Sequence, residues 1–172
     1  MTTPFAIRIA GQLTEDEFQT LFKWGENIFG IEDGLFQWRP KDVHLLAETG
    51  GRVVAHVGLL RHSVEVAGRG VEVGGVGAVV TVPEAQGRGY AQAGMRRAAE
   101  FMCGEMGVEA GLLFCRDPLV PFYARLGWQL LADPVEVEQP QGKILMPLNV
   151  MVLPCEGRSW PAGAVRLNSL PW

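Results

Sequence analysis

The feature that most constrains the fold is a β-rich run that passes through a glycine-rich turn directly into a helical pattern. Residues 76–82 are rich in valine, and apolar residues then recur every three or four positions from about Tyr90 to Met106. Between them, Gly87 and Gly89 permit backbone conformations that other residues avoid. At such a junction the first N–H groups of the helix lack partners and the helix dipole is positive. The segment therefore predicts a strand–turn–helix unit that binds an anion such as phosphate.

Short strands and helices alternate along the remainder of the chain. Thr14 followed by Glu17 forms a capping box, the glycines within 49–52 predict a hairpin turn, and Gly127 ends a short helix. Glycines at 74, 75 and 77 interrupt a long strand, which indicates a β-bulge or the close approach of another group. Strands are expected at 5–9, 43–48, 53–66, 71–82, 110–115, 128–131 and 149–153, and helices at 14–29, 90–106 and 118–126.

This order of elements predicts a single α/β (α+β) domain over residues 1–172. The first strands are expected to pair antiparallel, and later connections cross over through helices. Residues from about 154 onward contain Pro154, Pro161 and Pro171 and are expected to form a loop-like tail.

Composition excludes several classes of protein. Fifteen Lys and Arg against nineteen Asp and Glu give a net charge of −4, which argues against a nucleic-acid partner. No apolar run approaches the ~18 residues of a membrane span, and the first residues lack the layout of a secretory signal. Cys103, Cys115 and Cys155 are odd in number and widely spaced, which predicts reduced thiols in a cytoplasmic protein. Cys103 and Cys115 are expected in the core, and nothing marks Cys155 as activated.

Two segments resemble the GCN5-related N-acetyltransferase (GNAT) superfamily. Residues 86–91, QGRGYA, satisfy its pyrophosphate-loop pattern Gln/Arg-x-x-Gly-x-Gly/Ala, and residues 122–128, FYARLGW, resemble its F-Y-x-x-x-G-F/W segment. The dinucleotide fingerprint fails because Gln92 stands where its third glycine belongs, and the P-loop pattern lacks its Lys and Ser/Thr. The resemblance covers residues 53–131.

The resemblance implies a single-layer mixed, mostly antiparallel splayed sheet flanked by helices, with acyl-coenzyme A in the opening. Pantetheine would pair with the backbone of a strand, as an added strand does. These cofactor-binding positions are Val79, Val80, Thr81 and Val82 for pantetheine, and Gln86, Gly87, Arg88, Gly89, Tyr90 and Ala91 for the diphosphate.

The catalytic candidates are Tyr123 and His56. The resemblance gives Tyr123 the role of the acid that protonates the departing thiolate, since a phenol with a pKa near ~10 is protonated at neutral pH. A Tyr that only packs its helix on the sheet is the alternative. The strand glutamate common in the family is absent from 74–79. His56 is a candidate base, with a hydrogen-bonded buried histidine and a water chain as alternatives, so no base is fixed.

Acceptor binding is expected in the loop that precedes the second strand. Its candidate residues are Glu26, Glu32, Asp33, Phe36 and Trp38. The acids would hold an ammonium group and the aromatic rings would cover a ring or a cation; a solvated acidic loop around a buried Trp is the alternative. No metal is expected, because His44, His56 and His62 lack metal-ligand spacing.

Residues 55–61 are similar to the region before the cofactor loop in aminoglycoside 2′-N-acetyltransferases and nodulation-factor N-acyltransferases. The expected function is transfer of acetyl from acetyl-CoA, or of another acyl group from its acyl-CoA, to a small-molecule amine such as an amino sugar. Direct attack in a ternary complex is expected. A protein or peptide amine and a non-catalytic acyl-CoA-binding module are the alternatives. No membrane partner is expected, and a homodimer is left open.

Overall fold

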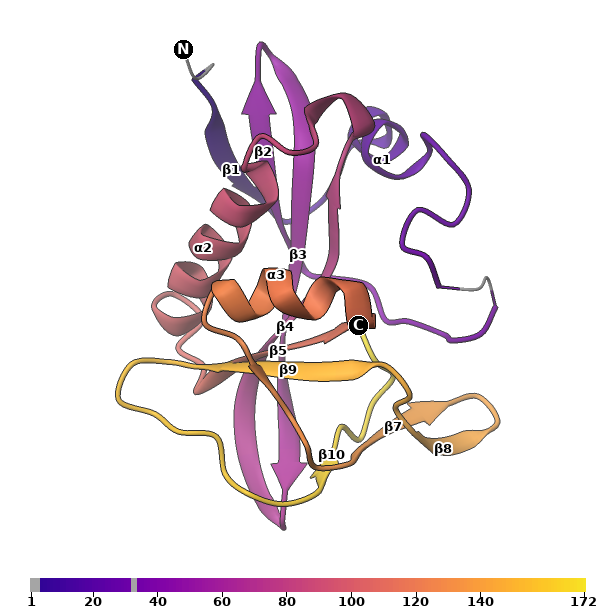
Figure 1. The fold of residues 1–172 in the computed structure, drawn as a ribbon, viewed down its shortest axis with the longest axis vertical. Coiled ribbons are helices and arrows are strands. Elements are labelled where there is room, and N and C mark those ends of the chain that lie inside the picture. Colours follow the sequence, from indigo (N-terminus) through magenta and orange to yellow (C-terminus); the bar gives the residue numbers. More distant parts are fainter. Residues whose placement is uncertain (1–3, 32–33) are drawn as a thin grey trace.

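The chain folds around one ten-stranded mixed sheet with helices on both faces (Figure 1). The structure is a computed structural model and describes residues 4–31 and 34–172. The strands are β1 (Ala6–Ala10), β2 (Val43–Thr49), β3 (Arg52–Val66), β4 (Arg69–Thr81), β5 (Ala110–Cys115), β6 (Gln129–Leu130), β7 (Val135–Gln139), β8 (Gly142–Leu145), β9 (Asn149–Pro154) and β10 (Val165–Arg166). The helices are α1 (Glu15–Phe22), α2 (Tyr90–Cys103) and α3 (Val120–Arg125), with 3₁₀ turns at Pro83–Ala85 and Asp117–Leu119.

The strands follow the order β6-β9-β5-β4-β3-β10-β7-β8, and the β1–β2 pair joins β3 through β2. Among the described strands, β4–β5 and β7–β10 pair in parallel and the other pairs are antiparallel. The predicted fold class, a mixed and mostly antiparallel sheet flanked by helices, is confirmed.

Helices α1 and α2 cover opposite faces of the sheet, as two neighbouring residues of β3 show. A Cβ on Gly94 of α2 would lie 3.1 Å from Val57, whereas the ring of Phe22 on α1 lies 5.2 Å from the ring of His56. Successive side chains of a strand point to opposite faces. The face covered by α1 therefore carries His56, and the face covered by α2 carries Val57.

Several local predictions are confirmed. Thr14 and Glu17 form the predicted capping box at the start of α1. The turn between β2 and β3 has positive φ at Gly50 and Gly51, +57° and +74°, and Gly127 after α3 has a φ of +93°. Helix α1 ends at Phe22 instead of Phe29, with Trp24 Nε1 bonded to the carbonyl of Leu21 at 2.8 Å. The apolar residues after it pack from a loop.

The region after residue 131 holds more strand than predicted. Strands β7 and β8 form a hairpin, and β10 lies within the expected tail, parallel to β7. Trp172 is 3% exposed and donates from Nε1 to the carbonyl of Leu112 at 3.1 Å. A Cβ on Gly75 would lie 2.3 Å from the Trp172 ring. The predicted close approach at the strand glycines is therefore confirmed, and at this position the tail supplies it.

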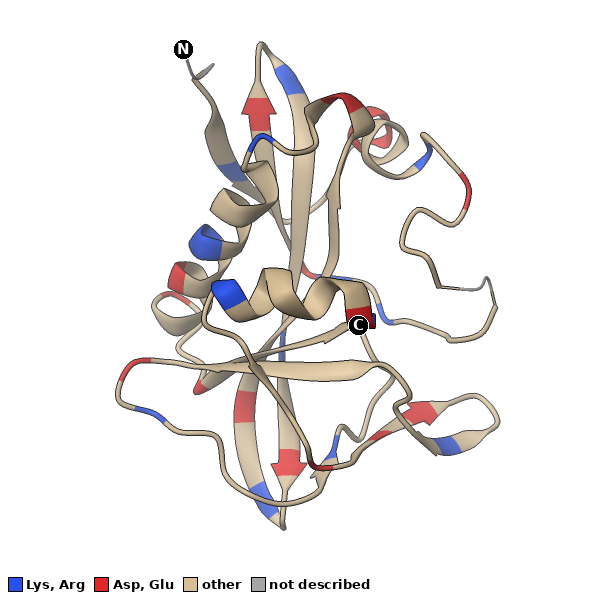
Figure 2. Cartoon of the chain, viewed as in Figure 1, with Lys and Arg blue, Asp and Glu red and all other residues tan. Residues whose placement is uncertain are grey.

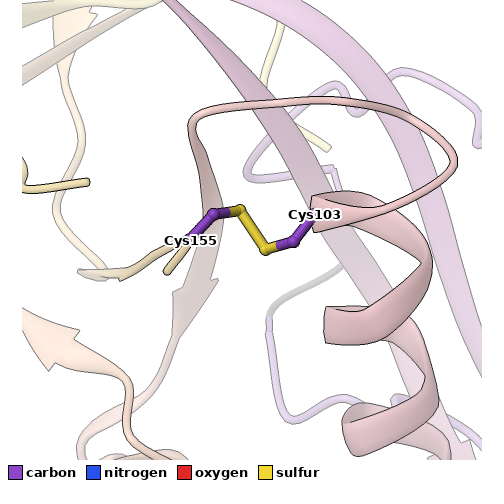
Figure 3. The surroundings of a disulfide bond; sticks show 2 residues. All are labelled: Cys103 and Cys155. Atoms are coloured by element: carbon purple, nitrogen blue, oxygen red, sulfur yellow. A yellow bond between two sulfur atoms is a disulfide. The ribbon is translucent and has the colours of Figure 1, made fainter. Parts of the chain in front are cut away.

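The expectation of three reduced thiols is wrong for one pair. Cys103 at the end of α2 and Cys155 after β9 form a disulfide with a Cα–Cα distance of 5.5 Å (Figure 3). Cys115 is free and 4% exposed, and burial raises its pKa to about 11. The pair is 52 residues apart, and no local pattern reveals that two such ends meet. Disulfides are rare in the cytosol, so the cytoplasmic location stays a prediction.

Charged positions of both signs are interspersed along the ribbon (Figure 2). Within residues 4–31 and 34–172, no helix is both long and apolar enough to cross a bilayer. The same residues contain no cluster of three or more His, Cys, Asp or Glu side chains placed to hold a metal ion.

Candidate active site

A fork opens where β4 and β5 separate. The two strands pair from Val73–Ala110 to Val76–Leu113, but β4 continues to Thr81 and β5 to Cys115 without further pairing between them. One edge of β4 is thus left open beyond Val76, while its other edge stays bonded to β3 through Val80 and Thr81. The open edge contains the predicted pantetheine positions 79–82.

A β-bulge lies at the base of this fork. Gly58 of β3 faces Gly77, and His56, two residues earlier, faces Val80, so β4 contains one extra residue here. Ala78 takes a φ of +51°, which is uncommon for a residue with a side chain. Its carbonyl oxygen accepts a hydrogen bond from His56 Nδ1 at 2.7 Å. The bulge that the strand glycines predicted is confirmed.

The predicted diphosphate loop, residues 86–91 and called the diphosphate loop below, joins the 3₁₀ turn Pro83–Ala85 to α2. Gly87 and Gly89 have φ values of +74° and +85°, and a Cβ on either would meet no atom within 4 Å. Gly89 is the N-cap of α2 and provides no side-chain cap, and no acidic residue lies in the first turn. Arg88 is exposed beside these amides. Open amides, a positive helix end and a cation form a site that fits a diphosphate.

The fork leads into a cavity of about 1060 Å³ on the face covered by α1. Its walls come from α1 and the loop after it, the bulge of β4, the end of β5, α3 and the C-terminal residue. Most lining side chains are apolar, and many are aromatic: Phe18, Phe22, Phe29, Phe36, Trp38, Phe114, Tyr123 and Trp172. The polar contributors include Lys23, Glu26, Lys41, His44, His56 and Arg116.

Tyr123 reaches this cavity from α3. It is the second residue of the predicted segment 122–128, and its side chain is 6% exposed. Burial raises the pKa of Tyr123 well above its usual value, and the neighbouring Cys115 adds to that shift. The phenol therefore keeps its proton at neutral pH and can act as a donor.

His56 and His44 form a hydrogen-bonded pair on the cavity wall. His44 Nδ1 lies 2.8 Å from His56 Nε2, and the rings are 5.1 Å apart. His56 is 2% exposed, and burial lowers its pKa to about 4 against the opposing effect of its bond to Ala78. His44 is half-buried, and burial followed by the charge of Lys41 lowers its pKa. Both rings are therefore neutral at pH 7.

The side chain of Lys41 packs over Gly58 and Gly77 at the bulge. A Cβ on Gly58 would lie 2.5 Å from Lys41 Cγ, and a Cβ on Gly77 would lie 2.5 Å from Cε and 3.2 Å from Nζ. The ammonium donates to the carbonyl of Arg39 at 3.2 Å. Burial, followed by the charge of Arg39, lowers the pKa of Lys41 to about 8. These two glycines make room for a cation at the base of the fork.

The predicted acceptor residues lie in this cavity where the structure describes them. Glu26, Phe36 and Trp38 line it, whereas Glu32 and Asp33 fall outside the described residues. The ring of Trp38 lies 5.5 Å from Phe36 and 6.3 Å from Phe114. Of the predicted cofactor positions, Tyr90 is buried, so it offers backbone groups only.

The sequence interpretation missed Lys41, His44 and Trp172 at this site. His44 and His56 carried a usable signal, because both lie on strands that the hairpin turn at 49–52 joins. In the observed register Leu46 faces His56, so His44 lies two residues along the same face. No comparable pattern marks Lys41 or Trp172.

Comparison with known proteins identifies the family. The profile of the acetyltransferase (GNAT) domain matches residues 10–131 of the 172-residue chain. A comparison with the curated proteins finds no match. Among solved structures, the GNAT family N-acetyltransferase YhbS from Escherichia coli, in complex with CoA, has a TM-score of 0.58 and 18% identity, covering 95% of this chain and 89% of that chain.

Two further structures show the same fold. A GNAT family acetyltransferase from Brucella melitensis, in complex with acetyl-CoA, has a TM-score of 0.55 and 19% identity, over 93% of this chain and 94% of that chain. A GCN5-related N-acetyltransferase from Kribbella flavida has a TM-score of 0.54 and 21% identity, over 73% of this chain and 34% of that chain. The chain thus spans about a third of the latter protein's length. On the profile match and the observed fold, the chain belongs to the GNAT acetyltransferase family.

Proposed function

We propose that this protein transfers the acetyl group of acetyl-CoA to a primary amine of a small molecule by direct attack in a ternary complex. The observation that carries the proposal is the fork between β4 and β5, which connects the diphosphate loop to a largely aromatic cavity of about 1060 Å³. The loop suits the diphosphate and the open edge of β4 suits pantetheine. The thioester would then lie at the bulge, next to Tyr123.

The chain's residues divide the work along this path. Backbone amides of residues 87–90 and the Arg88 guanidinium bind the diphosphate, and the open edge of β4 from Val79 to Val82 orients the pantetheine arm. Tyr123, which burial keeps protonated, gives its proton to the departing sulfur. The proton acceptor comes from the histidine pair of which His56 is a member. Binding both substrates side by side supplies the proximity that direct attack requires.

The lining of the cavity supports a hydrophobic amine that also carries an anionic group. Aromatic rings from four parts of the chain surround the space, and Lys41 is partly desolvated there. A carboxylate would offset the cost of holding that cation. An amino sugar, the acceptor expected from the sequence, would find fewer polar partners among the described residues, since Glu26 is the acid that lines the cavity.

A thiol-release assay over an amine panel, combined with calorimetry of coenzyme A binding, tests the proposal. The panel contains an aromatic amine with a carboxylate, an amino sugar and a lysine-containing peptide. Release with the first two classes supports a small-molecule acceptor, and release with the peptide alone supports a protein acceptor. Coenzyme A binding without release would favour a non-catalytic module. Absence of any heat with coenzyme A overturns the proposal.

A further inference from the structure

A row of hydrogen bonds crosses three strands on the face of the sheet covered by α1. It runs from the carbonyl oxygen of Ala78 in the bulge of β4 to His56 on β3, and from His56 to His44 on β2. The two contacts measure 2.7 Å and 2.8 Å between heavy atoms. Both imidazoles line the cavity. The row therefore connects the base of the fork with the acceptor side of the cavity.

The direction of each hydrogen bond follows from the carbonyl at one end. A carbonyl oxygen only accepts, so the proton of His56 is on Nδ1. His56 is 2% exposed, and the neutral ring then has a lone pair on Nε2. His44 Nδ1 must donate to that lone pair. A neutral His44 with its proton on Nδ1 presents an unprotonated Nε2, and this nitrogen has no hydrogen bond to the described residues.

The charges around His44 come from its own segment and from α1. Lys41 disfavours a positive charge on the ring, whereas Asp42 and Glu17 favour one. His56 lies against the ring of Phe22 on its other side, at 5.2 Å. The His56 ring is thus enclosed, and the His44 ring is the half-buried member of the pair. A proton taken up from the cavity would be held on Nε2 of His44, while His44 Nδ1 continues to donate to His56 Nε2.

We propose that Nε2 of His44 takes the proton from the attacking amine, and that His56 is a positioning residue that fixes the tautomer and orientation of His44. This inference rests on the N-acetyltransferase function proposed above and names the base for it. The bulge at Ala78 then has two roles: it opens the strand and it aims the carbonyl that anchors the pair.

The transfer balances with these groups. A neutral amine attacks the thioester carbon, a C–N bond forms, and the proton shed by nitrogen goes to His44 Nε2. The C–S bond breaks with its electron pair on sulfur, and Tyr123 gives sulfur its phenolic proton. His44 then releases its proton to solvent, and the phenolate of Tyr123 regains one. The products are an amide and coenzyme A in its thiol form.

The tautomer is measurable without turnover. Long-range ¹H–¹⁵N NMR spectra of the wild-type protein at pH 8 should give His44 the pattern of an Nδ1-protonated neutral ring. In His56→Asn, the amide can still approach the carbonyl of Ala78 but cannot reach His44, so the His44 signals should change to a tautomer mixture. Spectra that place the wild-type proton on Nε2 of His44 overturn the proposal.

Kinetics test the role with a matched control. His44→Gln should lower kcat by about 10²–10⁴-fold and remove the acidic limb of the kcat/KM profile. His56→Asn should lower kcat less, with its acceptor KM nearly unchanged. His62→Gln is the control, because His62 bonds to Arg39 and to the carbonyl of Leu167 and does not line the cavity. Its kcat should stay within about twofold, below 0.5 kcal/mol.

The outcomes separate the base from the function. If the kcat of His44→Gln stays within about threefold of the wild-type value, the base assignment alone is overturned. If none of the amines supports thiol release by the wild-type protein, although calorimetry shows coenzyme A binding, the proposed function is overturned and the base assignment with it. A His44→Gln variant must show wild-type coenzyme A affinity for its loss of kcat to count as support.

Discussion

The diphosphate loop and one wall of the cavity differ in what the chain contributes to each. The loop is contiguous in sequence, is exposed at residues 86–89 and offers main-chain amides, and a Cβ on Gly87 or Gly89 would meet no atom within 4 Å. The wall is built from Lys41, His44 and His56, whose desolvated side chains converge from two strands and the segment before them. A site made of backbone leaves a local sequence motif, whereas a site made of converging side chains depends on the tertiary fold.

The largest expected effect concerns Tyr123, which we propose as the proton donor of the reaction and not as part of either binding surface. Tyr123→Phe should lower kcat by about 10²–10⁴-fold because the departing sulfur loses its proton donor. The Kd of coenzyme A, measured by calorimetry, should stay within about twofold, since the loop and the strand proposed to bind it are unchanged. An unchanged kcat would remove Tyr123 from the chemistry.

The side-chain wall should respond to acid. Burial holds the pKa of His56 near 4 in the folded protein, against 6.5 for an unperturbed imidazole. Between these two values the unfolded chain binds a proton that the folded chain does not, so stability decreases as the pH falls through this window. The loss is on the order of 3 kcal/mol by pH 4. Urea titrations from pH 7 to pH 4 should show it, and His56→Asn should lack most of it.

Lys41 predicts a pH effect in the alkaline range. Its folded-state pKa of about 8 lies below the 10.5 of an unperturbed lysine, so the folded protein is destabilised while Lys41 is charged. Lys41→Met should raise the free energy of unfolding at pH 7 by on the order of 2–3 kcal/mol. That advantage should shrink between pH 8 and pH 10.5, where the wild type sheds the proton. The same variant should raise the KM of an anionic acceptor if Lys41 binds it.

The smallest effect should appear at the backbone-built loop. Gly89→Ala places a side chain at a φ of +85° beside the helix amides, and Gly68→Ala provides the same strain at +82° in an exposed turn between β3 and β4. Both should lose about 1–2 kcal/mol of stability. Only Gly89→Ala should weaken coenzyme A binding, by about tenfold. Equal affinities for the two variants would argue against the loop as the binding site.

The predictable parts of the molecule are those fixed by local signals. The capping box at Thr14, the hairpin glycines and the helix after Gly89 each specify their own backbone. The predicted length of α1 is wrong because apolar residues continue the helical pattern after Phe22 but pack from a loop. The ring of Phe29 in this loop lies 6.2 Å from the ring of Phe22 at the end of the helix. The β7–β8 hairpin carries a local signal of its own, since valine and glutamate alternate along β7.

The unpredicted parts of the site depend on contacts between distant segments. Nothing next to Gly75 in the sequence shows that Trp172 fills the space above it. Similarly, the tautomer of His44 depends on the carbonyl of Ala78 in β4. That carbonyl does not contact His44 and acts on it through the hydrogen bonds of His56. These contacts depend on the register of the strands and on the position of the C-terminal tail against the sheet. No local sequence pattern indicates either.

The bond between Cys103 and Cys155 closes a covalent ring that contains β5, α3 and β9. Tyr123 belongs to this ring, and the diphosphate loop lies outside it, at the far end of α2. Helix α2 thus links the proposed diphosphate loop at its first residue to the disulfide-closed ring that carries Tyr123 at its last residue. If the Cys103–Cys155 disulfide were reduced, the distance between the diphosphate loop and Tyr123 would depend on side-chain packing alone.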